Sequence, residues 1–555
     1  HTPPANLDTI ITLPKATQII AHSKRRNAPS PLDHITKDLL KAAPTATARH
    51  IHAALAKVSI LQQEPLLWKH GDAIPLHKGS GPTAKAPSYR SIILASEIPK
   101  IHYAFLRNNL NEFLLQTLNP TQCGGLPGRT TAYAAQLAST ITNYLTHKKI
   151  TTIRYYIDLT AAFHTVVRET VFGNRHDNTP EDLAHEPYHQ QEDFPKALIP
   201  LAELILTQPG ILDTNNCPEH MQIQLIESYR AAHFTCKSSA NTAHSPGGTR
   251  PGNSLADAIY NLSFAQPLKK IAEYIITKHY AIKIEDPTVP LLSNYRLRND
   301  NTDKYATGAA FVDDTLLLAQ CPDNNIIEYC MSDLAANTHT ILTSYGFRLN
   351  YKPGKSAFTL NIRGQGTIAA KQRLHEDNSH TIFCPEWDLN IPITHIYDYL
   401  GTHLDPTCST TVRAIHQITK QKAAMAPLRP THLRNQQLRT AIKVQLVDMF
   451  ANCHLYYQAE TWEPLTTSTT QALDSARNQA YRTATRRHYL TNNNQGTNDD
   501  DMHILTNTTD YTTMLRPKRL HYLVSLLQHG PAILLRTLDA HHAQTIDQQE
   551  SDTSS

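Results

Sequence analysis

Two adjacent carboxylates stand between two apolar runs in Ala310-Phe311-Val312-Asp313-Asp314-Thr315-Leu316-Leu317-Leu318. The pattern predicts a strand, a tight turn carrying Asp313 and Asp314, and a second strand. Two like charges beside apolar strands are costly to bury unless a cation neutralises them, and Mg²⁺ held by carboxylates and substrate phosphates is one solution. The alternative is a polar hairpin tip that happens to be Asp-Asp.

A third carboxylate comes from residues 151–163, which read Thr-Thr-Ile-Arg-Tyr-Tyr-Ile-Asp-Leu-Thr-Ala-Ala-Phe. The β-branched and aromatic residues predict a strand that runs into Asp158, and the small residues after it suit the start of a helix. One carboxylate at a strand end and two on a hairpin suit a two-metal site for phosphoryl transfer. In such a site one metal lowers the pKa of an attacking 3′-hydroxyl, and the other holds the triphosphate.

Further segments surround these two in a fixed order. They are Pro75–Gly79 with Ser88–Leu94, Gln122–Arg129, Gly248–Asp257, Gly346–Asn350 with Lys355, and Tyr399-Leu400-Gly401. Together with Asp158–Phe163 and Phe311–Asp314, they run from Pro75 to Gly401, within a stretch of likeness that covers roughly residues 30–490. This order resembles the reverse transcriptases of non-LTR (LINE-like) retrotransposons, and is most similar to a divergent protist branch of that family.

The resemblance implies an α+β right-hand polymerase fold with a palm built on an antiparallel sheet. The expected parts are a helical N-terminal extension (1–60), fingers (61–150), a palm (151–404) and a helical thumb (405–490). The C-terminal region (491–555) is expected to contain a linker, a short helical unit (518–540) and a disordered tail. Short strands are expected between residues 61 and 130, and an amphipathic helix over Ala132–Leu145. Polar stretches near 173–195 and 282–306 are expected to be insertions in the palm.

The resemblance also implies a catalytic centre. Asp158, Asp313 and Asp314 are the expected ligands of two Mg²⁺ ions, for which Mn²⁺ could substitute. Lys355 is a candidate general acid that protonates the leaving pyrophosphate. A solvated surface lysine is the alternative for Lys355.

Four residues are expected to contact the substrate. Phe163 is expected beneath the sugar of the incoming nucleotide, where a bulky ring excludes a 2′-hydroxyl, and a core Phe is the alternative. Lys78 and Arg90 are expected on the triphosphate, because an ammonium and a guanidinium fork suit phosphate oxygens, and ordinary surface charge is the alternative. Gly252 is expected to let the backbone approach the primer–template, since it has no Cβ.

The charge, the cysteines and the apolar runs of the chain indicate which kinds of partner it is expected to bind. A net charge of +4 is mild for a protein that holds a polyanion, but eleven Lys or Arg oppose four acidic residues between residues 410 and 490. This block is expected to grip the RNA template and the primer–template duplex. The eight cysteines include no C-x-x-C pair, so neither a zinc site nor a disulfide framework is indicated. No apolar run approaches 18 residues, so no membrane span is expected.

Two functions stay open. The three carboxylates and Phe163 favour a working RNA-directed DNA polymerase, a nucleotidyltransferase expected in the nucleus. The modest charge, the lack of a recognisable nuclease segment, and Pro251, where the family commonly has Gln, favour a retired enzyme. Such a protein would be an RNA-binding or scaffold subunit of a ribonucleoprotein such as an organellar ribosome, expected in the mitochondrion. A viral-type RNA polymerase ranks third, because Phe163 argues against it. The chain begins at His1 rather than Met, so a fragment or a processed product is expected.

Overall fold

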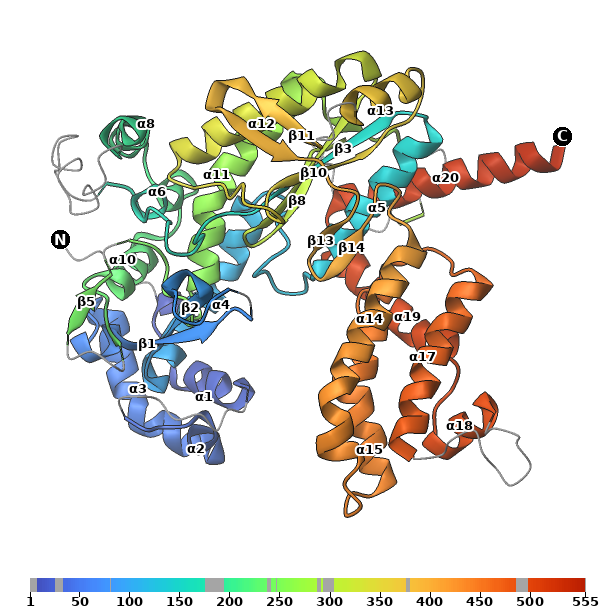
Figure 1. Cartoon of the computed structure of the whole chain (residues 1–555). Helices are drawn as coiled ribbons and strands as arrows, with labels where there is room; N and C mark the ends of the chain where they lie inside the picture. The colour runs from blue at the N-terminus through green and yellow to red at the C-terminus, as the bar shows by residue number, and fades with distance from the viewer. Residues whose placement is uncertain are drawn as a thin grey trace. The chain divides into compact units, whose positions relative to one another are not determined.

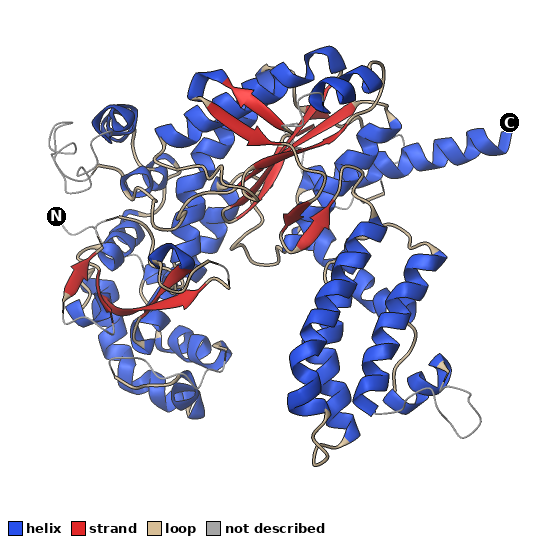
Figure 2. Cartoon of the chain, in the orientation of Figure 1, coloured by secondary structure: helices blue, strands red, loops and turns tan. Residues whose placement is uncertain are grey.

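The computed structural model describes residues 7–24, 33–79, 81–174, 194–236, 241–245, 247–286, 291–292, 304–375, 380–485 and 498–554. Over these residues the protein is a mixed structure of many helices and several small sheets (Figure 1; Figure 2), which confirms the expected α+β class. The chain divides into two compact units, each assembled from separate segments. Unit 1 comprises His1–Pro127, Leu159–Glu273 and Asn337–Asn350, and unit 2 comprises Gly128–Asp158, Tyr274–Ala336 and Tyr351–Ser555.

Unit 1 contains a four-stranded sheet in the order β2-β1-β4-β5. Its strands are β1 (His70–His77), β2 (Tyr89–Leu94), β4 (His233–Cys236) and β5 (Thr242–His244). β1 pairs antiparallel with β2 and parallel with β4, so the sheet joins segments that are far apart in the sequence. The short strands expected between residues 61 and 130 are β1 and β2.

The first three helices of unit 1 lie in the N-terminal extension (1–60), which was expected to be helical. The helices described wholly within unit 1 are α1 (Leu13–His22), α2 (Lys37–Ala42), α3 (Pro44–Leu61), α4 (Glu97–Thr117), α6 (Glu169–Phe172), α8 (Phe194–Thr207), α9 (Ile211–Thr214) and α10 (Glu219–Tyr229). α4 lies where only short strands were expected. Its buried Leu106, Leu110 and Leu114 recur at the four-residue spacing of a helix face, which explains the difference. Two longer helices, α11 (Ala256–Thr277) and α12 (Ile327–Ser344), contribute residues to both units.

Unit 2 is built around a second four-stranded sheet, in the order β10-β3-β9-β8. The strands are β3 (Thr151–Ile157), β8 (Gly308–Phe311), β9 (Asp314–Cys321) and β10 (Ala357–Asn361). Every pairing in this sheet is antiparallel, as the sequence predicted. All seven residues of β3 are buried, so β3 is a central strand in both position and environment.

Among the described residues, the other strands of unit 2 form three antiparallel pairs. They are β6–β7 (Ile282–Lys283, Tyr305–Ala306), β11–β12 (Thr381–Cys384, Leu389–Pro392) and β13–β14 (Tyr397–Tyr399, Thr402–Leu404). The β13–β14 turn is Leu400-Gly401, and both residues have a left-handed φ, 51° and 79°. This pair of positive angles is typical of a tight two-residue hairpin turn.

Helix α5 (Thr131–His147) is present where a helix was expected, but the amphipathic interpretation was wrong. Its buried residues are spread over almost the whole circumference, from Ala132 and Tyr133 to Tyr144 and Leu145. α5 packs against the sheet and against α20 (Ala532–Ser554), the last helix of the unit. Its many alanines and small polar residues are therefore contact surfaces rather than a solvated face.

Apart from α13 (Thr367–His375), the remaining described α-helices of unit 2 form a bundle. They are α14 (Thr410–Leu428), α15 (Thr440–Val447), α16 (Cys453–Leu455), α17 (Thr467–Thr485), α18 (Asp499–Thr506) and α19 (Tyr511–His529). Tyr511 and Leu515 of α19 share a core with Leu455 and Trp462, so α19 packs within the bundle. Among the described residues, no helix is both long and apolar enough to cross a membrane.

The C-terminal region differs from expectation. Gly530-Pro531 separates α19 from α20, where one short helical unit was expected, and α18 begins at Asp499, inside the expected linker. α20 continues to Ser554 through the tail that was expected to be disordered. No Gly or Pro interrupts residues 532–554, and Ala, Leu, Gln and Glu favour a helix.

Of the expected insertions, residues 175–193, 287–290 and 293–303 lie outside the described residues.

Candidate active site

The carboxylate hairpin is formed by β8 and β9, which place Phe311 opposite Asp314. Its loop has only two residues, Val312 and Asp313, and Val312 takes a left-handed φ of 59°. Asp314 is the first residue of β9 rather than part of the turn. The expected strand–turn–strand is confirmed, with the turn one residue earlier than expected.

Asp158 comes to this hairpin through the pairing of β3 with β9. The last pair of that ladder is Ile157 with Thr315, so the next residues along the two strands, Asp158 and Asp314, come opposite each other. The helix expected after Asp158 is absent. Turns follow instead, because Ala161 takes a left-handed φ of 52° that a right-handed helix cannot contain.

The electrostatics of Asp314 show that the three carboxylates share one small region. The pKa of Asp314 is raised to about 6, first by the loss of water around the carboxyl group and then by the negative charges of Asp313 and Asp158. Lys355 lowers the pKa and so offsets part of this effect. Although Asp314 is exposed when the residue is taken as a whole, burial of its carboxyl group is the largest cause of the raised pKa, and the crowding of negative charge adds to it.

Lys355 lies against Asp158 and is not an isolated surface lysine. Its Nζ is 2.9 Å from Asp158 Oδ1, although about half of the lysine side chain remains exposed. The next residue, Ser356, accepts a hydrogen bond on its Oγ from the Asp158 backbone N–H at 3.1 Å. Ser356 comes directly before β10, which pairs with β3, so sheet pairing fixes the position of Lys355 beside Asp158.

The four expected substrate contacts all belong to unit 1. Lys78 and Arg90 lie on the β1–β2 hairpin, where Leu76 faces Arg90 and the Lys78 backbone N–H donates to Ser88 O at 2.8 Å. This register puts the Lys78 and Arg90 side chains on the same face as diagonal neighbours. The hairpin therefore presents two cations together, which suits an anionic ligand.

Phe163 and Gly252 have more mixed surroundings. The Phe163 ring is half-buried and lies 5.0 Å from the ring of Tyr260, which itself contacts Phe264 and Phe347. Phe163 is therefore at the edge of an aromatic cluster rather than deep in a core. A Cβ on Gly252 would come within 2.5 Å of the Ile93 carbonyl oxygen, and the φ of Gly252 is 106°. Close packing of β2 thus requires this glycine whatever its role toward a primer–template.

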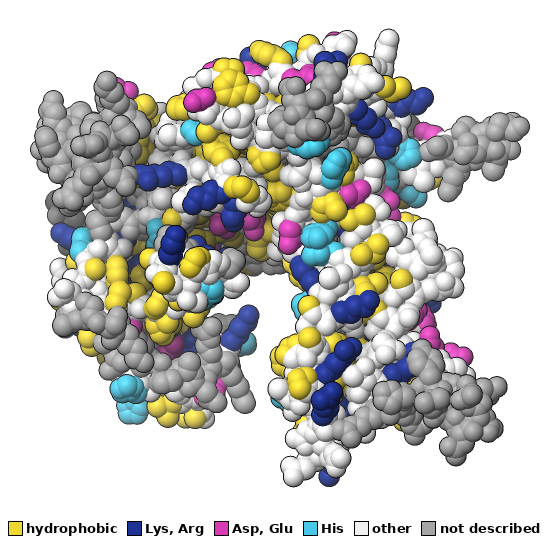
Figure 3. Space-filling view, viewed as in Figure 1, with side chains coloured by type: hydrophobic (Ala, Val, Ile, Leu, Met, Phe, Trp, Pro, Cys, Tyr) yellow, Lys and Arg dark blue, Asp and Glu magenta, His cyan; other side chains and the backbone are white. Residues whose placement is uncertain are grey.

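The basic block of residues 410–490 divides into structural and surface residues. Arg413, Lys443, Arg477 and Arg482 are buried. Arg477 donates to Tyr456 Oη at 2.9 Å, so it belongs to the interior of the bundle. Lys422, Arg429, Arg434 and Arg439 are exposed on and between α14 and α15, where Figure 3 shows Lys and Arg side chains gathered. The expectation that the whole block grips nucleic acid was therefore too broad.

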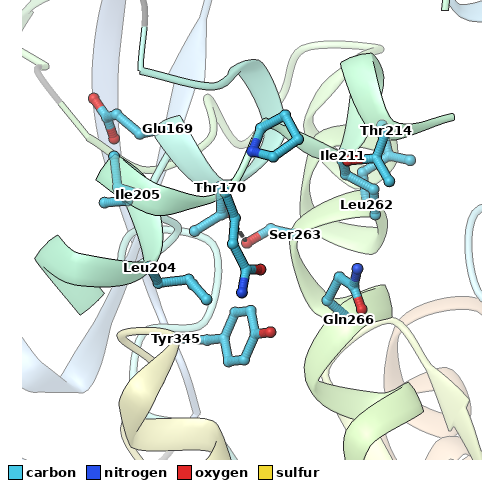
Figure 4. Close-up of a pocket in the computed structure, with 12 residues that line it drawn as sticks. Glu169, Thr170, Leu204, Ile205, Ile211, Thr214, Leu262, Ser263, Gln266 and Tyr345 are labelled. Carbon is cyan, nitrogen blue, oxygen red and sulfur yellow. Dashed lines mark hydrogen bonds between the residues drawn. The ribbon is translucent and has the colours of Figure 1, made fainter. Parts of the chain in front are cut away.

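A cavity of about 200 Å³ lies in unit 1 among α6, α8, α9 and α11, and none of the predicted site residues lines it. Figure 4 shows Leu204, Ile205 and Tyr345 on one side of it, and Thr170 bonded to Ser263. Glu169 is the only carboxylate among its lining residues. The cavity therefore lacks the paired acids of the carboxylate site.

Sequence reasoning missed the side chains of the β13–β14 hairpin. Tyr397 stacks on Tyr156 of β3 with ring centroids 4.0 Å apart, and the charge of Asp398 contributes to the raised pKa of Asp314. The hairpin therefore flanks the carboxylate site. The signal available was Tyr399-Leu400-Gly401, which marks the turn but not the polar residues on either side.

No protein-family model matches the chain, and no curated protein matches it either. The function is therefore argued from the residues and their geometry. Within unit 2 that geometry joins Asp158, Asp313, Asp314 and Lys355, and within unit 1 it joins Lys78 and Arg90.

Proposed function

We propose that this chain is an RNA-directed DNA polymerase with a right-hand fold, which extends a primer along an RNA template. The observation that carries the proposal is that Asp158, Asp313 and Asp314 lie together at one end of an antiparallel sheet. Lys355 forms an ion pair with Asp158. In this proposal the sheet of unit 2 is the palm, the β1–β2 hairpin belongs to the fingers, and the α14–α19 bundle is the thumb.

The donor set fits hard divalent cations such as Mg²⁺. Three carboxylates supply oxygen ligands, and the mutual repulsion that raises the pKa of Asp314 is the kind that a bound cation relieves. Asp158, Asp313 and Asp314 would hold the metal, and Mg²⁺ or Mn²⁺ would supply charge stabilisation for phosphoryl transfer.

The protein's own residues would complete the reaction centre. Ser356 and the β3–β10 pairing keep Asp158 and Lys355 in place, and Lys355 would hold the proton that the leaving pyrophosphate requires. Lys78 and Arg90 would bind the triphosphate oxygens as a point charge and a fork. Phe163 would exclude a 2′-hydroxyl and so select deoxynucleotides.

The test is primer extension on an RNA template with Mg²⁺ and deoxynucleotides. Asp313→Asn removes one charge at almost constant volume, so we expect extension to fall by about 100-fold or more, since catalysis here rests on charge and positioning. RNA binding and thermal stability should stay close to those of the unmodified chain. The matched control is Asp388→Asn, at an exposed left-handed residue of the same unit, which should extend normally.

A second candidate, an RNA-binding or scaffold subunit without chemistry, is favoured by the burial of Arg413, Lys443, Arg477 and Arg482. Because these four side chains are buried, they stabilise the bundle and are not available to bind a primer–template duplex at its surface. The same assay separates the two functions. If the unmodified chain binds RNA but extends no primer on RNA or DNA templates with Mg²⁺ or Mn²⁺, the polymerase proposal fails and the scaffold function stands.

A further inference from the structure

The β13–β14 hairpin and helix α14 bring two histidines and one aspartate together. Asp398 and His403 are direct partners across the hairpin ladder, so their side chains leave the same face. His416 comes from α14, and its ring stacks on the His403 ring with centroids 3.4 Å apart and planes at 26°. One potential ligand atom from each residue lies within 4.8 Å of the others.

We propose that Asp398, His403 and His416 form a binding site for a transition-metal cation of the Zn²⁺ class, distinct from the all-oxygen site of Asp158, Asp313 and Asp314. Two imidazoles and one carboxylate are ligands that Zn²⁺ accepts and Mg²⁺ rarely takes. Ligands of a tetrahedral zinc ion stand about 3.3 Å apart, given zinc–ligand distances of about 2.0–2.1 Å. The ligand atoms of the three residues lie within 4.8 Å of one another, and the exposed side chain of Asp398 is free of the packing that would fix its rotamer.

An unsatisfied nitrogen supports the site independently. His416 Nε2 is buried and has no hydrogen-bond partner among the described residues. A buried polar atom without a partner is costly, and native structures rarely leave one without a reason. A metal ion bound by this nitrogen would remove the cost.

Lys420 is the opposing charge at this site. It lies one turn after His416 on α14, and its Nζ donates to the Gly401 carbonyl oxygen at 2.8 Å. That bond ties the ammonium to the hairpin turn, while the Asp398 carboxylate supplies one compensating negative charge. Three protein ligands leave a fourth position for water, and the ion would clamp the hairpin to α14.

The test uses the full chain, stripped of metal by a chelator and kept in excess Mg²⁺. Zn²⁺ is titrated in competition with a chromophoric chelator, and Co²⁺ serves as a spectroscopic probe because tetrahedral Co²⁺ gives intense visible bands. We expect one equivalent to bind, with imidazole-dependent Co²⁺ bands. His403→Gln and His416→Gln should each weaken binding by about 100-fold or more, which exceeds the effect of losing an outer-shell group. The matched control, His432→Gln at an exposed histidine of the same bundle, should bind normally.

Two further variants keep the outcome decisive. Asp398→Asn alters an exposed ligand and should weaken Zn²⁺ binding without disturbing the fold, even if His416→Gln folds poorly. Asp313→Asn reports the other carboxylate site and should leave Zn²⁺ binding unchanged. The proposal is overturned if none of Asp398→Asn, His403→Gln and His416→Gln weakens binding, or if Asp313→Asn is the change that abolishes it. The result does not depend on whether the chain polymerises DNA.

Discussion

Val312 holds a backbone conformation that a β-branched residue rarely adopts. Its φ of 59° lies in the left-handed region, at a cost of about 1–3 kcal/mol. The β8–β9 ladder on either side holds the residue there and sets Asp313 at the second position of a two-residue loop. Strain of this kind concentrates at functional sites, so it supports the carboxylate hairpin as the centre of the chemistry.

Phe163 offers a test of sugar selection. Phe163→Ala should let ribonucleotides in and lower the preference for deoxynucleotides by at least tenfold, a change of about 1.4 kcal/mol in discrimination. Because the ring is half-buried, the loss of stability should be smaller than the roughly 3–5 kcal/mol of a core Phe. Single-nucleotide incorporation with paired dNTP and rNTP substrates measures the preference.

The control for Phe163 lies in the same aromatic cluster. Phe347 is 1% exposed, so Phe347→Leu should lower the melting temperature and leave the nucleotide preference unchanged. A Phe163→Ala protein that is stable and still rejects ribonucleotides would remove the argument that this residue selects the sugar.

Glu64 predicts a pH dependence of stability in unit 1. Burial raises the pKa of Glu64 from 4.5 to about 7, although a hydrogen bond from Tyr103 Oη at 2.9 Å acts in the opposite direction. The folded protein therefore binds the proton more tightly than the unfolded chain. Between about pH 4.5 and 7 the free energy of unfolding contributed by Glu64 should fall as pH rises, by no more than about 3 kcal/mol.

Glu64→Gln keeps the shape of the side chain and removes its titration. Urea unfolding at a series of pH values should show a flatter profile for this variant, with the largest gain over the unmodified chain at pH 7 and above. Glu112→Gln, at an exposed position of α4, is the matched control. Parallel profiles for Glu64→Gln and the unmodified chain would contradict the prediction.

At the scale of elements, the region of α14 and α15 contains both buried and exposed basic residues, and only the exposed ones are available to a ligand. Lys422, Arg429 and Arg439 are exposed on this part of the bundle. Replacing all three by Ala should weaken RNA binding and reduce the slope of log K against log salt by about 2–3, since each lost phosphate contact removes about 0.7–0.9. Binding titrations at several salt concentrations measure the slope.

The control for the triple variant of Lys422, Arg429 and Arg439 removes the same amount of positive charge from another part of the surface. It replaces three exposed lysines outside the bundle, namely Lys57, Lys269 and Lys371. The control should change the overall affinity slightly through net charge and leave most of the slope intact. Equal losses in the two triple variants would show that α14 and α15 form no specific binding face.

Local sequence patterns predicted some elements and missed others for physical reasons. β3 and the β8–β9 hairpin were predictable because β-branched runs and a two-residue loop are local signals. The burial of α5 on almost all sides was not predictable, because the sequence does not show which elements will cover its Ala, Ser and Thr residues. The second half of α20 was taken for a disordered tail because it is polar, although it continues a helix whose first half is anchored by buried Leu534 and Leu535.

At the scale of the whole molecule, the candidate site depends on pairings that no local pattern contains. The resemblance predicted that Asp158 and Asp313 belong together, but the register that sets Ile157 against Thr315 comes from contacts between distant segments. The cluster of Asp398, His403 and His416 fits no short ligand motif, so it could only be found once α14 was placed beside the hairpin. The two units are likewise each assembled from three separate segments.

The enclosed position of α5 also has a consequence for the time course of synthesis on the ribosome. Ribosomes add about 5–20 residues per second, so α20 leaves the ribosome about 20–80 s after α5 is complete. Through that interval the surface of α5 that α20 will cover has no cover from its own chain. During synthesis, residues 131–147 therefore present apolar and small side chains to other proteins for tens of seconds before their own chain can cover them.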